Sequence, residues 1–254
     1  MEHITSTKNA QVAAIKALKN RRERENTGAF LVEGVKMVGE ALAIESRVLS
    51  LWATDETLLP TAIDCPCYVV PQHVMQALCN TVTPQGIAAV VKLPKAPEIQ
   101  SLGEKIIALD DVQDPGNVGT ILRTADAAGF TGAILSLGSA DPFAPKCLRA
   151  TMGSIFRLPI YLAQDITEPL SALKERGFSL LASELSEDDF FARENVENSF
   201  ALIIGNEGNG ICKNVSAIAT HHLALPMAGG AESLNAAIAA GIMMYDLSFR
   251  KEKK

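Results

Sequence analysis

Apolar and polar positions alternate along residues 1–92 in a way that indicates a small α/β unit. Val12, Ile15 and Leu18 recur every three residues and predict a helix over 9–20, which ends in the polar run NRRERENTG. Beyond this run, short apolar stretches typical of buried strands alternate with helical patterns. The expected strands are 29–34, 47–54, 67–70 and 86–92, and the expected helices are 35–43 and 73–79.

A second pattern follows residues 93–104, LPKAPEIQSLGE, whose two prolines, glycine and mixed polarity predict a linker. From there on strand-like runs alternate with helical patterns, which favours a parallel sheet with helices on both faces. We therefore expect an α/β protein with a small N-terminal α/β domain at 1–94, a linker at 95–104 and a C-terminal parallel-sheet domain at 105–254. The latter's strands are expected near 105–109, 132–137, 157–162, 178–183, 200–204 and 221–225, and its helices near 117–129, 165–176, 211–217 and 233–249.

The composition indicates a globular chain, and the sequence has no pattern typical of a membrane span or a metal site. Of its 254 residues 48% are hydrophobic and 20% are charged, which excludes a disordered chain. No apolar run reaches membrane-spanning length and the N-terminus lacks the apolar core of a signal peptide, so we expect a cytoplasmic protein. Five cysteines predict reduced, mostly buried thiols, because neither Cys65-Pro66-Cys67 nor His221-His222 has companions at metal-ligand spacing.

The distribution of charge is more informative than the net charge of −6. Residues 1–36 hold seven Lys or Arg against four Glu, a local +3, whereas residues 105–249 hold nine basic and seventeen acidic side chains, a local −8. The tail RKEKK is basic again. This asymmetry is compatible with one half of the chain contacting phosphates, although a solvated basic helix end would give the same pattern.

The first candidate site lies in DDVQDPGNVGTILRTADAAGF (110–130), which follows the apolar run KIIALD. Asp114-Pro115-Gly116 predicts a tight turn, and a helical pattern starts at Asn117. A strand, a turn and a helix in this order bring polar residues to the carboxyl end of a strand, where open α/β sheets bind ligands. Arg123, two turns into the helix, is either a ligand-facing residue or an ordinary surface arginine.

The second candidate is ALIIGNEGNGI (201–211), a β-branched run that ends in a loop with Gly205, Gly208 and Gly210. The loop is not a Walker motif, since no Gly-Lys-Ser/Thr follows, and its glycine spacing is not that of the dinucleotide fingerprint. Glu207 is its only charge. Either the backbone approaches a ligand closely here, or the loop is an ordinary glycine-rich connection.

The third candidate is LALPMAGGAESLNAAIAAGIMMYDL (223–247), in which a strand runs into a loop and then a helix. Ser233 is the expected N-cap of that helix. Small residues in the helix allow close backbone approach. Its apolar stripe predicts core packing or a subunit interface, and consists of Leu234, Ile238, Ile242 and Tyr245.

Together the three stretches resemble the SpoU-type (TrmH-like) RNA ribose 2′-O-methyltransferases of the trefoil-knot (SPOUT) superfamily. The matching segments, in the family's order, are 114–130, 203–211 and 225–242, with 151–159 similar to the segment before a central strand. AFLVEGVKMVGEAL (29–42) and TVTPQGIAAVV (81–91) resemble the beginning and end of the family's N-terminal RNA substrate-binding domain. All three motifs are present at once, and the resemblance covers most of the chain.

The resemblance implies a doubly wound C-terminal domain whose last segment is threaded into a trefoil knot, a feature that is otherwise nearly absent from proteins. It also implies S-adenosylmethionine as cofactor, a homodimer formed through the C-terminal domain, and RNA, most often ribosomal RNA, as substrate. The implied reaction is methyl transfer to a ribose 2′-hydroxyl without a metal. Transfer RNA as substrate stays open, as does a noncatalytic RNA-binding protein with the same fold. A nucleotide-dependent oxidoreductase is disfavoured by the absence of G-x-G-x-x-G.

Residue roles follow from the same resemblance. The cofactor-binding positions are Gly205, Leu225, Met227 and Leu234, and the polar catalytic set is Arg123, Asn117, Glu207, Ser233 and Asn235. Members of the family are often described with Arg123's counterpart as general base, but guanidinium hardly ever loses its proton, so a phosphate clamp is the alternative. Asn117 and Glu207 are expected to orient Arg123, and Ser233 and Asn235 to form hydrogen bonds across the pocket.

RNA recognition is expected in the N-terminal domain. Its few aromatic residues (Phe30, Trp52 and Tyr68) predict that contacts to phosphate and shape dominate over base stacking. The basic residues expected to lead these contacts are Lys19, Arg21, Arg22 and Arg24.

Overall fold

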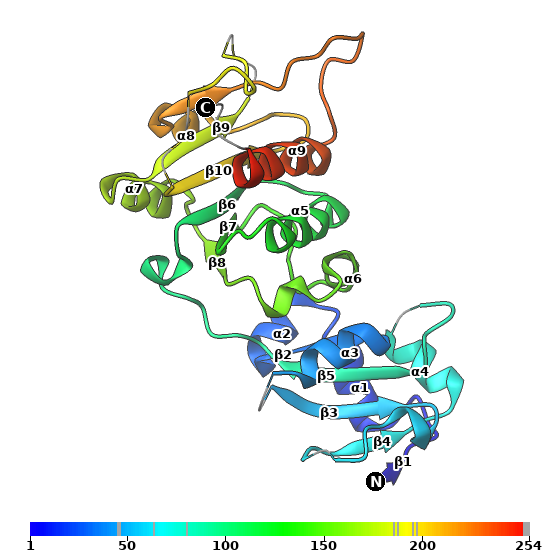
Figure 1. The fold of residues 1–254 in the computed structure, drawn as a ribbon. Coiled ribbons are helices and arrows are strands. Elements are labelled where there is room, and N and C mark those ends of the chain that lie inside the picture. The colour runs from blue at the N-terminus through cyan, green and yellow to red at the C-terminus, as the bar shows by residue number, and fades with distance from the viewer. Residues whose placement is uncertain are drawn as a thin grey trace. The chain divides into compact units, whose positions relative to one another are not determined.

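The computed structural model describes residues 1–44, 47–62, 64–79, 81–184, 186, 188–194, 196 and 198–250. All but the first residue of the basic tail RKEKK lies outside the described residues. The chain forms two compact units, Met1–Lys95 with Phe143–Phe156, and Ala96–Pro142 with Arg157–Lys254. Each unit contains its own sheet (Figure 1).

The first unit is built on a mixed sheet of five strands in the order β1-β4-β3-β5-β2. β4 is parallel to β1 and β3, while β5 is antiparallel to β3 and β2. The strands are β1 (Glu2–His3), β2 (Ala29–Glu33), β3 (Val48–Ala53), β4 (Cys67–Val69) and β5 (Ile87–Lys92). The four predicted strands are thus confirmed, as are helices α1 (Ala10–Ala17), α3 (Val35–Leu42) and α4 (Gln72–Cys79).

The sequence did not predict a second helix, α2 (Arg21–Thr27), within the polar run. The Asn20 side chain accepts a hydrogen bond from the Arg22 backbone N–H and caps this helix, and Gly28 ends it at φ +63°. A helix with so little apolar surface lacks the periodicity on which the prediction depends.

A further helix that the sequence did not predict, α6 (Pro145–Thr151), belongs to the segment 143–156. This segment packs with the first unit, where the buried ring of Phe30 lies 5.2 Å from that of Phe143 and 6.2 Å from that of Phe156. Residues 143–156 therefore belong to the first unit, although they fall within the domain predicted at 105–254. The boundaries of the predicted domains otherwise stay a prediction.

The second unit is a fully parallel sheet of six strands in the order β11-β9-β10-β6-β7-β8, as the alternation of elements predicted. Its strands are β6 (Lys105–Asp110), β7 (Gly132–Ser136), β8 (Ile160–Ala163), β9 (Ser179–Ser183), β10 (Phe200–Gly205) and β11 (His221–Leu223). The central strands β6 and β10 are almost entirely buried, which explains why they read as continuous apolar runs.

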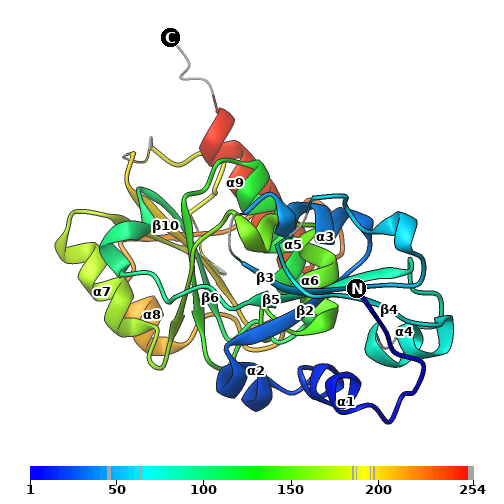
Figure 2. The ribbon, with the colours of Figure 1, turned by 90° about the horizontal axis from the view of Figure 1, so that it is seen from below.

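Helices cover both faces of this sheet, with α7 (Thr167–Glu175) and α8 (Lys213–Ile218) on one side and α5 (Pro115–Ala127) and α9 (Ala236–Phe249) on the other (Figure 2). Side chains of β6 alternate between the faces: Ile106 and Ala108 join the cluster that contains α7 and α8. In register, Asp110 at the end of β6 lies beside Gly205 at the end of β10. The loops that follow these two strands therefore start side by side.

Candidate active site

Gly205 ends β10 and is buried beneath the loop that follows it. Asn206 and Gly210 exchange two backbone hydrogen bonds of 2.9 Å, which fold the loop back on itself. A Cβ atom on Gly205 would lie 2.2 Å from the Gly210 carbonyl carbon and 2.3 Å from the Ile211 nitrogen. Glycine is thus required by the protein's own backbone, a different reason from the expected approach of a ligand.

Asn206 joins the loops after β10 and β6, a role that the sequence analysis missed. Its Oδ1 accepts the backbone N–H groups of Gly208 and Asn209, both at 2.9 Å, and its Nδ2 donates to the Asp111 carbonyl at 2.8 Å. An Asn that opens a turn after a strand is typical of such side-chain to backbone bonding. That signal was present in the sequence, but the partner Asp111 lies 95 residues away.

Glu207 connects the glycine-containing loop to the start of α5. Its Oε1 accepts hydrogen bonds from Asn117 Nδ2 (2.9 Å) and the Asp114 backbone N–H (3.2 Å), and its Oε2 accepts the Gln113 N–H (3.1 Å). Partial burial acts to raise the pKa of Glu207, but the hydrogen bonds from Asn117 and the backbone outweigh it and lower the pKa below its ordinary value. A charged carboxylate with both oxygens engaged is a structural connector and a poor proton acceptor.

Asn235 extends this connection to α9. Its Nδ2 donates to Asn117 Oδ1 at 3.0 Å, while its Oδ1 caps α9 by accepting the backbone N–H groups of Ala237 and Ile238. The predicted cap, Ser233, was therefore wrong: the helix starts two residues later, where the capping residue also bonds to α5. Asn235, Asn117 and Glu207, named here the polar chain, hold together two helix starts and one loop.

Arg123 and Ser233 do not join the polar chain. Both are exposed, and neither side chain makes a hydrogen bond or ion pair with another described residue. The expectation that Asn117 and Glu207 orient Arg123 is not met, because six positions along a helix turn the side chain by about 240°. Arg123 thus presents an unpaired guanidinium, and Ser233 an unpaired hydroxyl.

The predicted cofactor residues Leu225, Met227 and Leu234 lie in a loop, 225–234, that has no helix or strand. Met227 and Leu234 are 37% and 38% exposed, and Leu225 is half-buried. No residue of this loop forms a hydrogen bond with the rest of the described chain. Free backbone N–H donors and C=O acceptors between apolar side chains suit the binding of an adenosine group.

Of the four basic residues predicted to bind RNA, only Arg22 has an exposed side chain with no partner among the described residues. Arg21 pairs with Glu25 at 2.8 Å, and Lys19 Nζ donates to the Ala77 carbonyl at 3.2 Å. Burial, followed by the nearby Lys16, lowers the pKa of Lys19.

Arg24 does not fit the predicted RNA-facing role. It is 3% exposed, and its guanidinium donates to the carbonyls of Leu18 (2.7 Å) and Lys19 (2.8 Å), which closes the turn between α1 and α2. The aromatic residues are also internal: Trp52 is buried and stacks on Tyr68 at 4.3 Å, and Phe30 is buried.

Two absences concern the part of the chain that the structure describes. No three His, Cys, Asp or Glu side chains are grouped there as a metal site would require. None of its helices combines the length and the apolar surface needed to cross a membrane. None of the five cysteines, all of which the structure describes, forms a disulfide, and only Cys79 and Cys147 are buried, so the expectation of mostly buried thiols was wrong.

The fold and the site define a class: an α/β protein with a network of polar side chains at the carboxyl ends of its parallel strands, where open α/β sheets bind ligands. Residues 104–245 match the SpoU rRNA Methylase family, and residues 9–89 match the MRM3-like substrate binding domain. The chain belongs to the SpoU rRNA methylase family.

Individual relatives are similar to this protein over nearly the whole chain. The 23S rRNA (guanosine(2553)-2′-O)-methyltransferase RlmP of Bacillus subtilis (strain 168) is 38% identical over 97% of this chain and 99% of its own. The AdoMet-bound rRNA methyltransferase of Sinorhizobium meliloti has a TM-score of 0.87 and 33% identity, covering 96% of each chain. The SpoU methyltransferase AviRb of Streptomyces viridochromogenes, in complex with AdoMet, has a TM-score of 0.85 and 28% identity, covering 95% of this chain and 97% of its own. The predicted class of enzyme, an S-adenosylmethionine-dependent RNA methyltransferase, is confirmed.

Proposed function

We propose that this protein methylates a ribose 2′-hydroxyl of ribosomal RNA. The observation that carries the proposal is the polar chain, which holds together the starts of α5 and α9 at the carboxyl ends of the parallel strands. Arg123, further along α5, is exposed and unpaired in the described chain, and the apolar loop 225–234 leads into α9. The relative RlmP is named for 2′-O-methylation of 23S ribosomal RNA, and the match at residues 9–89 is to a substrate-binding domain.

The cofactor site consists of Gly205, Leu225, Met227 and Leu234. S-adenosylmethionine supplies an electrophilic methyl group when bound. Free backbone groups of 225–234 read the polar edge of the adenine, and the side chains of Leu225, Met227 and Leu234 cover its faces. Gly205 contributes indirectly, because it allows the adjacent loop to fold over the strand end.

The substrate side is formed by Arg123 and Ser233. The Arg123 guanidinium, exposed and unpaired in the described chain, clamps a backbone phosphate and stabilises negative charge that develops on the ribose oxygen. It stays protonated throughout, so the hydroxyl proton leaves to water or to a phosphate oxygen. The exposed Ser233 hydroxyl orients the nucleotide, and Asn117, Glu207 and Asn235 hold the frame.

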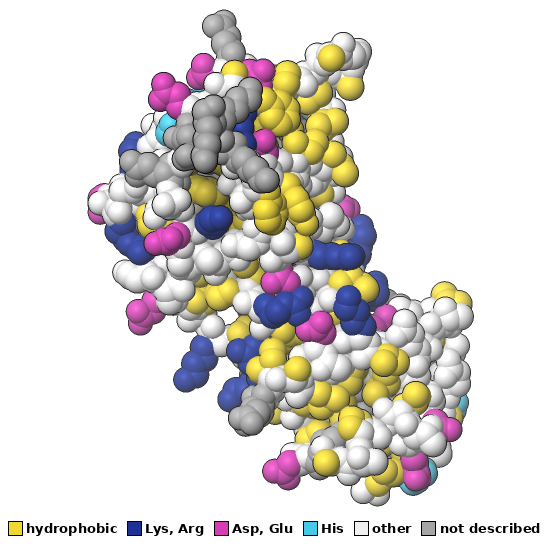
Figure 3. Space-filling view, viewed as in Figure 1, with side chains coloured by type: hydrophobic (Ala, Val, Ile, Leu, Met, Phe, Trp, Pro, Cys, Tyr) yellow, Lys and Arg dark blue, Asp and Glu magenta, His cyan; other side chains and the backbone are white. Residues whose placement is uncertain are grey.

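The protein forms a dimer with a second copy of the chain. The apolar stripe of α9 continues from Leu234 through Ile238, Ile242 and Tyr245 to Phe249, and Ile238 and Phe249 are 55% and 61% exposed. Hydrophobic side chains gather over α9 and the loop before it (Figure 3). An apolar surface of this kind favours a subunit interface, so the working form is a homodimer through the second unit.

The C-terminal segment is threaded as a trefoil knot. This part of the proposal is supported by the path of the chain: α9 follows the edge strand β11, yet it packs against α5 and the central strand β10. We assign the enzyme to the cytoplasm, where its ribosomal RNA substrate would be found.

Transfer of labelled methyl groups from S-adenosylmethionine tests the proposal. The substrates are ribosomal RNA and transfer RNA from a strain lacking the enzyme, and the position of the label is then mapped. We expect label on a ribose of ribosomal RNA, and a loss of about 10²–10³-fold in kcat for Arg123→Lys with cofactor affinity retained. The matched control, Arg176→Lys on an exposed helix end, should keep full activity. Label on a base, or on transfer RNA alone, would contradict the proposed substrate.

A further inference from the structure

The segment Asp188–Arg193, between β9 and β10, contacts the residue that leads into the loop 225–234. The backbone N–H of Ala224 donates to the Asp188 carbonyl at 2.9 Å, and the N–H of Phe190 donates to the Ala224 carbonyl at 2.8 Å. Asp189 and Ala224 thus form a short parallel bridge beyond the end of β11. This segment fixes the first end of the loop.

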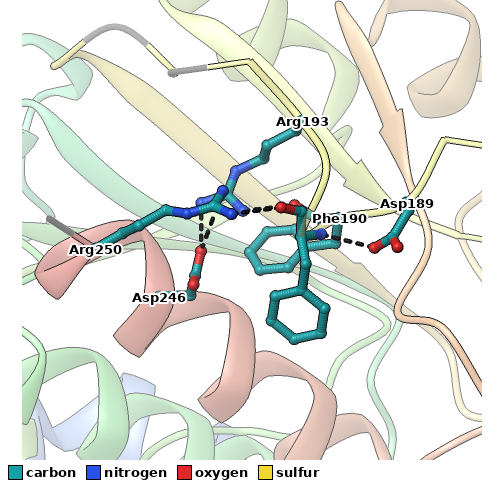
Figure 4. A network of polar contacts seen from close by, with 6 residues as sticks. Asp189, Phe190, Arg193, Asp246 and Arg250 are labelled. Atoms are coloured by element: carbon teal, nitrogen blue, oxygen red, sulfur yellow. Dashed lines mark hydrogen bonds and ion pairs between the residues drawn. The ribbon is translucent and has the colours of Figure 1, made fainter. Parts of the chain in front are cut away.

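The same segment also contacts α9, which begins where the loop ends. Arg193 donates to Asp246 Oδ1 at 2.7 Å, and Arg250 donates to the Phe191 carbonyl (Figure 4). Asp246 is the single charged residue of α9, whose sequence is AAIAAGIMMYDLSF. Because α9 is a stiff helix, holding Asp246 also positions Asn235 at its N-cap, roughly 16 Å away.

The side chain of Arg193 is built into this contact. It is 6% exposed, its guanidinium carbon lies 3.9 Å from the centre of the Phe190 ring, and it donates to the Phe190 carbonyl at 2.6 Å. The Phe190 ring is itself fully buried. A charge this deeply buried is tolerated only with a specific partner, and Asp246 is that partner.

We propose that Arg193 is a positioning residue for cofactor binding: by joining Phe190 to Asp246 it fixes both ends of the loop 225–234. The inference rests on the proposed function, in which this loop binds S-adenosylmethionine. Since the loop has no hydrogen bonds of its own to the described chain, its conformation depends on where its ends are held. A loop held in its binding conformation loses less entropy when the ligand binds.

The test measures S-adenosylmethionine affinity by calorimetry and backbone hydrogen exchange at 225–234 in the full-length protein. Arg193→Met removes the pair, and Arg193→Lys keeps the charge but not the two-directional donation. The control is Arg157→Met, which breaks an Arg–Asp pair of the same 2.7 Å length, with Asp126, elsewhere in the second unit. We expect Arg193→Met to weaken cofactor binding by about tenfold or more and to speed exchange in the loop. Arg157→Met should change the affinity by less than threefold, even where it lowers Tm as much.

The double variant of Arg193 and Asp246 tells whether Arg193 affects cofactor affinity through Asp246 or through a general loss of stability. If Arg193 acts through Asp246, the double variant Arg193→Met/Asp246→Leu should lose no more affinity than the worse single variant. If Arg193→Met does not fold, Arg193→Lys and the double variant give the same comparison.

Two results would overturn the inference: affinity within threefold of wild type in folded Arg193 variants, or an equal loss in Arg157→Met. Hydrogen exchange of the wild-type protein separates the proposed cofactor site from the role of Arg193. Absence of protection at 225–234 on adding S-adenosylmethionine would contradict the proposed cofactor site itself, whereas protection together with normal affinity in the Arg193 variants would contradict only the inference.

Discussion

Replacing Glu207 with glutamine tests the polar chain most directly, because it changes charge with almost no change in shape. The carboxylate accepts three hydrogen bonds, from Asn117 Nδ2 and from the backbone N–H groups of Gln113 and Asp114. In Glu207→Gln one oxygen becomes an NH₂ group, which cannot accept and which faces a donor. At least one charge-assisted bond is lost. Such a bond contributes about 1.5–3 kcal/mol when protected from water, and since Glu207 is exposed in part, we expect the free energy of unfolding to fall by about 1–2 kcal/mol.

The effect should also depend on pH, in a direction fixed by the lowered pKa of Glu207. A carboxyl whose pKa is lower in the folded than in the unfolded protein stabilises the fold fully above its unfolded value, near 4.5, and loses that contribution as the pH falls through the folded value. The difference in unfolding free energy between wild type and Glu207→Gln should therefore be constant from pH 7 to about 5 and shrink below about 4.5.

Urea unfolding followed by circular dichroism between pH 7 and pH 3 measures this difference. Glu175→Gln is the control, because it removes one carboxylate from the exposed end of α7 without touching the polar chain. A variant as stable as wild type at pH 7, or a difference that does not shrink in acid, would refute the reasoning that a charged Glu207 holds the two loops.

Four other substitutions have expected outcomes. Gly205→Ala should lower Tm and cofactor affinity together, because its Cβ would lie 2.2 Å from the Gly210 backbone; an unchanged melting curve would contradict this. Ile238→Glu should give a monomer by analytical ultracentrifugation, since it puts a charge in the exposed stripe of α9. Arg22→Glu should reduce RNA affinity and its salt dependence at unchanged stability, whereas Arg24→Met should lower stability by about 1–3 kcal/mol, because it removes the buried donor of two carbonyls. Equal effects of these two on the salt dependence would contradict the assignment of Arg24 to packing.

The parallel sheet of the second unit could be predicted from the sequence because each buried strand appears as an apolar run between helical patterns. The helices α2 and α6 could not. Helix α2, RRERENT, has one buried residue, Arg24, so no apolar stripe marks it. A charged residue in a polar run is expected to face water, and only the folded chain reveals the carbonyls of Leu18 and Lys19 that bind its guanidinium.

The site was predictable in its residue types but not in its connections. Ser233 and Asn235 are both good helix caps, and the choice between them depends on Asn117, which lies 118 residues from Asn235. In the same way, the pairing of Arg193 with Asp246 joins positions 53 residues apart that share no local pattern. Contacts of this kind depend on the topology of the sheet, which places the segment after β9 beside the end of β11.

The polar residues of the site therefore divide into two groups with different expected behaviour. The side chains of Asn117, Glu207 and Asn235 form hydrogen bonds with one another and with the backbone. Substituting any of the three should therefore reduce stability and activity together. Arg123 and Ser233 have no partner in the described chain, and their removal should leave the unfolding free energy nearly unchanged while methyl transfer is lost. In such a site the polar chain stabilises the fold, and the side chains of Arg123 and Ser233 stay available to a ligand. Substitutions in Asn117, Glu207 and Asn235 should therefore lower the free energy of unfolding more than substitutions in Arg123 and Ser233.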